Sequence, residues 1–337
     1  MGESDSPLYI NNESGYLMIK DEEYFAKKSQ HSSENSLVVK FQSLQGVPGS
    51  WFYKKYTKTH LNHLRTVHTV GYLLELLGYS VGEILGLFNV EKKKDTPFNL
   101  DSTFEDCMWG LVVLLGFFLV PVVFKTNPYS ISLIADKIQF YQVPVYGLFS
   151  IYLTTRKFFG LHKFFLVFNS ICLFVNSGFV FYIYSRVKYK DDGRYYVGWL
   201  EYVGAHVQFS MLAAWNLVEL CSCVIVLIVE LSNYHQDSKF LGWDNENWTL
   251  LLMSLAFVLG VIMLSSFKDV FFSFVLTYTF FAIYYQQTKS IGENKSSNVE
   301  VTSLVFGGLM SGFVVLTSAV YPNLICYSVR KSKKLTN

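Results

Sequence analysis

The stretch Glu201–Leu231, EYVGAHVQFSMLAAWNLVELCSCVIVLIVEL, decides the fold of this chain. It contains an apolar run long enough to cross a bilayer, which takes about 20 helical residues, and Glu219 lies near its middle. An ionised glutamate at the centre of a membrane costs about 2.5–3.5 kcal/mol or more. At about 100° per residue the polar residues of this helix share one side, which must therefore face other helices, water or a ligand. These residues are Glu201, Gln208, Asn216, Glu219, Ser222, Cys223 and Glu230.

The composition of the whole chain agrees with a membrane protein. Of its 337 residues 51% are hydrophobic, and only 16% are charged, whereas a soluble domain carries about 25% charged residues. The net charge of +2 argues for neither a nucleic-acid partner nor a strongly anionic one. The partner that the composition implies is the lipid bilayer.

Seven further segments are apolar enough to be candidate spans. They cover about 66–90, 107–124, 138–153, 164–184, 248–267, 270–285 and 302–321. Because a backbone in lipid must satisfy its own hydrogen bonds, these spans must be helices. We therefore predict an all-α, polytopic transmembrane helical bundle of about eight spans. If the first segment is instead an interfacial amphipathic helix, seven spans remain.

The polar segments at the two ends frame this bundle. Residues 1–49 are polar and acidic and contain no signal-peptide pattern, so we predict a disordered cytosolic tail. Residues 50–327 form the transmembrane domain, and the basic residues 328–337 form a second cytosolic tail. Lys and Arg are most frequent in the loops that this topology leaves in the cytosol, which places both termini there. The membrane is expected to be an endomembrane, of the endoplasmic reticulum or vacuole, or the plasma membrane.

The first span combines a small-residue face with a polar face. Gly78, Gly82 and Gly86 recur every four residues, a spacing that lets another helix approach closely. In the last span Gly308 and Gly312 form a second pair of this type. The adjoining polar face of the first span consists of His68, Tyr72, Glu75, Tyr79 and Glu83. Either this face contributes to an interior site, or the helix is interfacial.

Glu219 is the strongest candidate for a proton or substrate site. Asn216 precedes it by one turn, and Asn169 and Asn176 share a face of the fourth span. We expect the Glu219 carboxyl to be protonated and neutral, to be hydrogen-bonded by Asn or Tyr, or to face a wet cavity. Each asparagine has a simpler interpretation as an interhelical hydrogen-bonding group, typically worth about 0.6 kcal/mol.

Motifs for catalysis and cofactors are missing from the sequence. It contains no GxSxG, P-loop, GxGxxG or HExxH pattern, and its one histidine cluster, HLNHLRTVH at residues 60–68, does not place all three rings on one face. We predict no cofactor, no metal site and no catalytic residue, so an enzyme is the less favoured interpretation.

Three functions remain. The first is a proton-coupled carrier of a small solute or ion, centred on Glu219. The second is a non-catalytic membrane scaffold or chaperone, which binds other membrane proteins through its glycine-lined faces. The third is a lipid-modifying enzyme of the endoplasmic reticulum.

Overall fold

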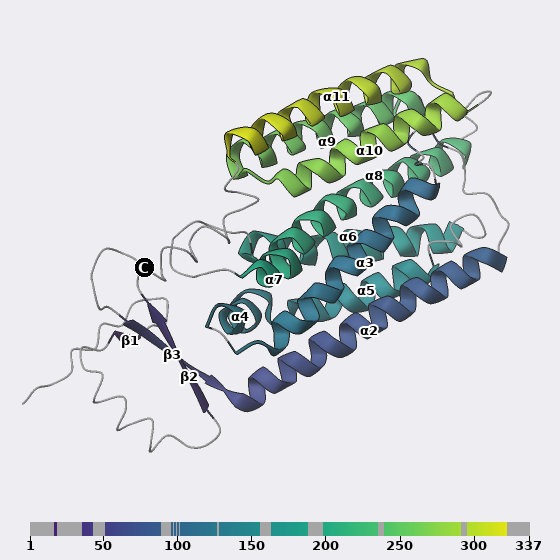
Figure 1. Cartoon of the computed structure of the whole chain (residues 1–337). Coiled ribbons are helices and arrows are strands. Elements are labelled where there is room, and N and C mark those ends of the chain that lie inside the picture. Colours follow the sequence, from purple (N-terminus) through teal and green to yellow (C-terminus); the bar gives the residue numbers. More distant parts are fainter. Residues whose placement is uncertain are drawn as a thin grey trace, which may run out of the picture.

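The long helices of the chain lie side by side with roughly aligned axes and form one elongated bundle (Figure 1). The computed structural model describes residues 17–18, 36–42, 51–88, 96, 98, 100, 102–126, 128–155, 163–187, 198–234, 239–290 and 295–321. In chain order the helices are α2 (Lys58–Phe88), α3 (Ser102–Phe124), α4 (Pro128–Ser132), the π-helix η1 (Leu133–Ile138), the 3₁₀-helix η2 (Gln139–Tyr141), α5 (Gln142–Thr155), α6 (Lys163–Val187), α7 (Trp199–Glu201), the π-helix η4 (Tyr202–Val207), α8 (Gln208–Tyr234), α9 (Asn245–Phe267), α10 (Val270–Lys289) and α11 (Ser297–Val320).

Each of the eight candidate spans forms a helix where the structure describes it, so the predicted helical membrane fold is confirmed. Five of these helices are long and apolar enough to cross a membrane by length and composition: Thr103–Phe124, Phe164–Val187, Trp199–Glu230, Asn245–Phe267 and Ser297–Val320. The number of crossings, eight or seven, stays a prediction. The first helix, α2, runs alongside α5 within the bundle, a position that favours a bundle helix over an interfacial one.

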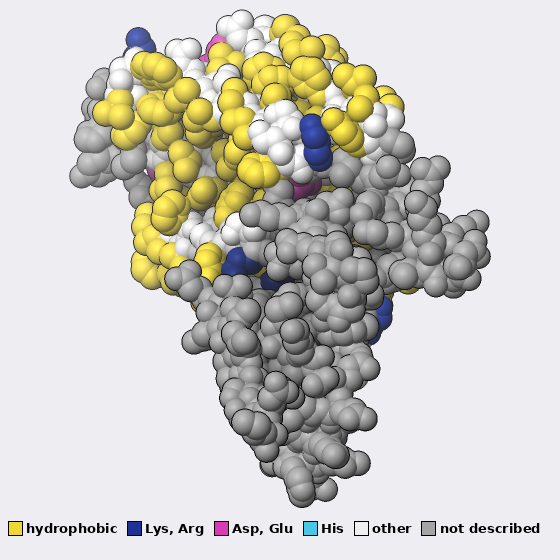
Figure 2. All heavy atoms as spheres, turned by 90° about the vertical axis from the view of Figure 1, so that its left-hand side faces the viewer, with side chains coloured by type: hydrophobic (Ala, Val, Ile, Leu, Met, Phe, Trp, Pro, Cys, Tyr) yellow, Lys and Arg dark blue, Asp and Glu magenta, His cyan; other side chains and the backbone are white. Residues whose placement is uncertain are grey.

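The outside of the bundle is apolar, and several of its polar groups are inside. Large apolar side chains of α11, such as Val315 and Leu316, are exposed, while Glu75, Asn216 and Glu219 are buried. Figure 2 shows apolar side chains crowding much of the described surface at one end of the bundle. This distribution suits a protein surrounded by lipid, because exposed apolar surface carries no penalty there and polar groups need partners inside.

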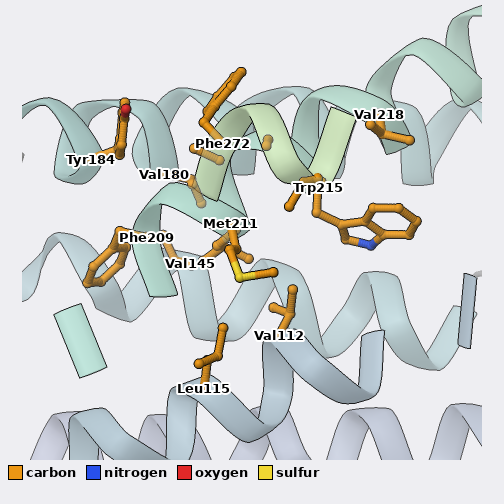
Figure 3. Close-up of a cluster of buried hydrophobic side chains, with 14 of the residues drawn as sticks. Val112, Leu115, Val145, Val180, Tyr184, Phe209, Met211, Trp215, Val218 and Phe272 are labelled. Carbon is orange, nitrogen blue, oxygen red and sulfur yellow. The ribbon is translucent and has the colours of Figure 1, made fainter. Parts of the chain in front are cut away.

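The central helix is α8, most of whose residues are buried. It lies between the α9–α11 group and the α2–α5 pair in Figure 1, and it packs against α3, α6, α9 and α10. Figure 3 shows its side chains Met211 and Trp215 in a buried apolar cluster with Val112 of α3 and Val145 of α5. The glutamate at the middle of α8 is therefore held by several helices at once.

Helix α8 is preceded by the π-helix η4, which follows directly from α7. A π-helix bonds residue i to i+5 and turns less per residue than an α-helix. Side chains before η4 therefore point in other directions than they would if one α-helix ran through them. The predicted single polar side therefore does not include Glu201. Its carboxyl faces α3 and α4 instead, where it bonds to Lys125 and Ser130.

Helices α9 and α10 pack against each other and form a tight hairpin, because only Lys268 and Asp269 separate them. Lys268 adopts a left-handed conformation with φ 57° and ends α9, and its N–H bonds back to Leu264, an arrangement typical of helix C-termini. The Asp269 side chain then accepts a hydrogen bond from the N–H of Phe272 at 3.0 Å and caps α10, which satisfies one of its unbonded N–H groups.

The N-terminal region contributes a small sheet. Three antiparallel strands, β1 (Leu17–Met18), β2 (Ser36–Gln42) and β3 (Trp51–Thr57), form it in the order β1-β3-β2. Leu37 pairs with Tyr56, and Phe41 pairs with Phe52, residue types that favour strands. The prediction of a disordered cytosolic tail over 1–49 stays a prediction, and β1 and β2 lie within that range. The rest of 1–49 and the basic tail 328–337 lie outside the described residues.

Candidate functional site

The Glu219 carboxyl is held between two aromatic donors from two other helices. Its side chain is only 3% exposed. The indole Nε1 of Trp109, on α3, donates to Oε1 at 3.1 Å. The hydroxyl of Tyr152, on α5, donates to Oε2 at 2.5 Å. Of the predicted environments for Glu219, hydrogen bonding by a tyrosine is therefore the one observed, and Trp109 was not foreseen.

Aromatic rings surround the two donors. The Trp109 ring lies 5.0 Å from the ring of Phe149 and 6.0 Å from that of Tyr152, measured between centroids. Trp215, one turn before Glu219, meets Trp109 edge to face at 6.0 Å. Because such a site has a low dielectric constant, each hydrogen bond to the carboxyl is electrostatically stronger than it is in water.

Two of the three predicted asparagines, Asn176 and Asn216, bond to each other one turn before Glu219. Asn176 of α6 donates from Nδ2 to Oδ1 of Asn216 at 3.4 Å, and Asn216 donates to the carbonyl O of Leu212 at 3.1 Å. The Oδ1 atom of Asn176 and the Nε1 atom of Trp215 are buried and have no hydrogen-bond partner among the described residues. The neighbourhood of Glu219 thus keeps one unused acceptor and one unused donor.

Asn169 does not join this group. Its Oδ1 accepts from the hydroxyl of Thr155 at 2.5 Å, and its Nδ2 donates to the carbonyl O of Thr155 at 3.4 Å. Both bonds tie α6 to the last residue of α5. Asn169 therefore has the interhelical role that was its simpler interpretation, although it shares a helix face with Asn176.

The polar face of α2 turns largely into the bundle. His68, Tyr72 and Glu75 are buried, whereas Glu83 is partly exposed. The Tyr72 hydroxyl donates to the carbonyl O of Val113, on α3, at 3.1 Å. The same face points toward α5, because the rings of His68 and Tyr146 meet edge to face at 6.2 Å. The structure thus brings three of these four residues together and leaves Glu83 at the edge.

The glycines differ in what they pack against. A Cβ at Gly78 would lie 2.8 Å from the Cα of Ser150, and a Cβ at Gly82 would overlap the carbonyl O of Leu153, so both glycines let α2 approach α5 closely. The surroundings of Gly86 lie outside the described part of the structure. At Gly308 and Gly312 a Cβ would meet nothing within 4 Å. These two glycines therefore pack against no other helix of the described chain, and their predicted role in helix packing stays a prediction.

Two further carboxylates anchor the bundle, Glu201 buried and Asp269 partly buried, and neither was predicted as a site. Glu201 accepts from Lys125 Nζ at 2.9 Å and from Ser130 Oγ at 3.0 Å. Asp269 accepts from the hydroxyls of Tyr184 and Ser210, and so joins α6 and α8 to the start of α10. An acidic residue in a two-residue connection is a typical helix N-cap, and that signal would have predicted the capping role of Asp269.

The described residues contain no group of three or more His, Cys, Asp or Glu side chains that could hold a metal ion. The four described cysteines are free thiols, with Cys107 exposed and Cys172, Cys221 and Cys223 buried. The chemistry available at the site therefore comes from the carboxyl, hydroxyl, indole and amide groups around Glu219.

Comparison with known proteins gives one finding. A family model described as "TSPO-like protein" matches residues 103–316, which is well over half of the chain and runs from the start of α3 into the last turns of α11. No curated protein and no solved structure gives a match. The matched region contains the Glu219 site, whereas α2 precedes it.

Proposed function

This chain belongs to the TSPO-like protein family, and on that premise we propose that it is a multi-pass membrane carrier that binds a proton at Glu219 and moves a small solute or ion with it. The observation that carries the proposal is the pair of hydrogen bonds from Trp109 and Tyr152 to the two oxygens of this buried carboxyl. Intramembrane carboxyl groups facing a bundle interior are typical of proton relays and transport pathways.

The two donors give the carboxyl a defined place for a proton. An indole N–H can only donate, so Oε1 of Glu219 always accepts from Trp109. The tyrosine hydroxyl can donate or accept. When Glu219 is ionised, Tyr152 donates to Oε2. When a proton arrives at Oε2, the carboxyl donates to the tyrosine oxygen, and the hydroxyl hydrogen of Tyr152 turns away to another acceptor. The same contact thus accommodates both states of the carboxyl.

A solute would bind beside this carboxyl. The unused N–H of Trp215 and the unused Oδ1 of Asn176 would bond to an acceptor and a donor of the solute. Sites for small molecules combine apolar and aromatic walls with a few such polar groups, and Trp109, Phe149 and Trp215 supply the walls. We further propose an endomembrane or plasma-membrane location with both termini in the cytosol, on the loop charges of the sequence.

The test is proton movement in vesicles. The purified protein is reconstituted with a pH-sensitive dye inside, and a panel of amino acids, organic acids, polyamines and nucleosides is applied outside. We expect at least one solute to drive a pH change that Glu219→Gln abolishes. The matched control is Glu300→Gln, since Glu300 is partly exposed in the first turn of α11. Equal solute-driven pH changes in Glu219→Gln and the wild type would sink the proposal.

A second function has an observation of its own. Gly308 and Gly312 form a small-residue pair on α11 that meets no other part of the described chain. Such a pair lets a helix of another membrane protein approach closely. If the protein is a scaffold of this kind, the Gly308→Leu variant should lose a partner that the wild type retains in mild-detergent pull-downs. If Gly308→Leu keeps every partner, this alternative falls.

A further inference from the structure

Three polar side chains outside the Glu219 site are almost completely buried and keep unused hydrogen-bonding atoms. His68 of α2 and Gln142 of α5 are each 1% exposed, and Gln208 of α8 is 3% exposed. Both ring nitrogens of His68 and the Oε1 atoms of Gln142 and Gln208 have no hydrogen-bond partner among the described residues. The backbone of Gln139 approaches the His68 ring without making a bond of normal geometry.

These groups lie in one region of the bundle. The His68 ring contacts Tyr146, and Gln142 precedes Tyr146 by one turn of α5, so both share that helix face. Gln208 of α8 lies near Tyr72, which is one turn after His68 on α2. A Cβ at Gly116 of α3 would lie 2.9 Å from the Tyr72 ring and 3.3 Å from Nε2 of Gln208, so these two side chains are neighbours beside Gly116.

Leaving these atoms unbonded would be costly. An unsatisfied buried polar group destabilises the folded state, and four such atoms, on α2, α5 and α8, would do so several times over. A purely apolar occupant leaves them unbonded. Water satisfies them, because it donates to amide oxygens and both donates to and accepts from the two nitrogens of an imidazole. Buried waters usually have two to four polar partners of this kind.

The helix beside this region is broken. The π-helix η1 ends at Ile138, and Gln139 has φ 52° and ψ −146°, a conformation that is unfavourable for a residue other than glycine. α5 begins three residues later. Both η1 and η2 pack against α2. Such a break interrupts the regular backbone hydrogen bonds between η1 and α5.

We propose that His68, Gln142 and Gln208 form a second interior site, whose ligand is a small cluster of water molecules entering at the η1–η2 break. Glu75 is buried on the same face of α2 and interacts electrostatically with Tyr72 and Tyr146, so the water places this carboxyl within reach of protons. Part of the site lies on α2, outside the region that matches the family model, and it is separate from the Glu219 site.

Hydroxyl-radical footprinting of the wild-type protein in lipid nanodiscs tests this proposal, because buried side chains are oxidised only where water lies beside them. Each residue is normalised to its rate in the unfolded chain. We expect His68 and Tyr146 to be oxidised severalfold faster than Phe149, which lies one turn beyond Tyr146 on α5 and is fully buried. Equal, low oxidation of all three residues would overturn the proposal.

A variant ties the signal to the site. Gln142→Leu removes one water-binding oxygen and adds an apolar group of similar size, so we expect slower oxidation at Tyr146 and His68 with an unchanged elution profile and helix content. Thr249→Val, at a buried position on α9, is the matched control and should change neither rate. Unchanged oxidation in a folded Gln142→Leu protein would also count against the proposal. These rates do not depend on Glu219 binding a proton, so the two proposals fail separately.

Discussion

Alanine substitution at Gly78 should destabilise the bundle, and the same substitution at Gly308 should not. At Gly78 the added Cβ would lie 2.8 Å from the Cα and 2.9 Å from the carbonyl O of Ser150. Both are backbone atoms, which cannot move aside as the end of a side chain can. Because carbon atoms pack at about 3.5–4.0 Å, α2 and α5 would have to separate by about 1 Å at this point.

The magnitude follows from a comparison of the two variants. Replacing glycine by alanine within a helix favours the helix by about 0.5–1 kcal/mol at either position. At Gly308 nothing opposes this gain, since no atom lies within 4 Å of the new Cβ. At Gly78 overpacking costs about 1–3 kcal/mol. That cost is therefore the expected difference in free energy of unfolding between the variants.

The assay is thermal unfolding in detergent, followed with a thiol-reactive fluorogenic dye. Cys221 and Cys223 are buried on the central helix, so they react when the bundle opens. At about 2–4 °C per kcal/mol, Gly78→Ala should melt several degrees below Gly308→Ala. Equal melting temperatures would refute the inference that Gly78 sets the distance between α2 and α5.

Three further predictions concern the carboxylates that hold the helices together. Tyr152→Phe should cost about 1–3 kcal/mol of stability, because it removes a donor to the buried Glu219; a double-mutant cycle with Glu219→Gln should give a coupling energy, and additive losses would contradict the observed hydrogen bond. Asp269→Ala should cost about 2 kcal/mol or more, through a lost N-cap and two hydroxyls that lose their acceptor, and a melting temperature equal to that of the wild type would contradict this. Lys125→Met should destabilise the protein more than Lys125→Met combined with Glu201→Gln, because the single change leaves a buried charge without its ion pair; thermal melts showing the opposite order would contradict it.

The sequence predicted the fold well because the decisive signals are local. Apolar runs of the right length predict helices in lipid whatever their neighbours, and each predicted segment is helical where the structure describes it. The Lys268–Asp269 connection was likewise readable as a hairpin. The strands β1 and β2 escaped prediction because their partner β3 follows them at a distance, and an isolated short strand has no strong signal of its own.

The candidate site was predicted only from the side of α8. Glu219 and Asn216 stand out because a polar group in an apolar run is costly. Their partners depend on how the helices pack. The chain contains 23 tyrosines, and the sequence does not indicate which of them donates to Glu219. A buried indole N–H needs an acceptor. The sequence therefore indicates that Trp109 needs one when it is buried, but it does not specify which group supplies it. For Glu201 the missing information was the π-helix, which has no recognised sequence pattern.

The proposal that Glu219 binds and releases a proton requires water to reach this carboxyl, and thiol accessibility tests that requirement. In a cysteine-free background, Glu219→Cys is exposed in intact membranes to a membrane-impermeant thiol reagent from each side in turn. The control is Val218→Cys, because Val218 is the preceding residue and belongs to the buried apolar cluster (Figure 3). We expect labelling at position 219 from at least one side and none at 218. No labelling at 219 from either side, in a folded protein, would make Glu219 a packing group and rule out a carrier centred on it.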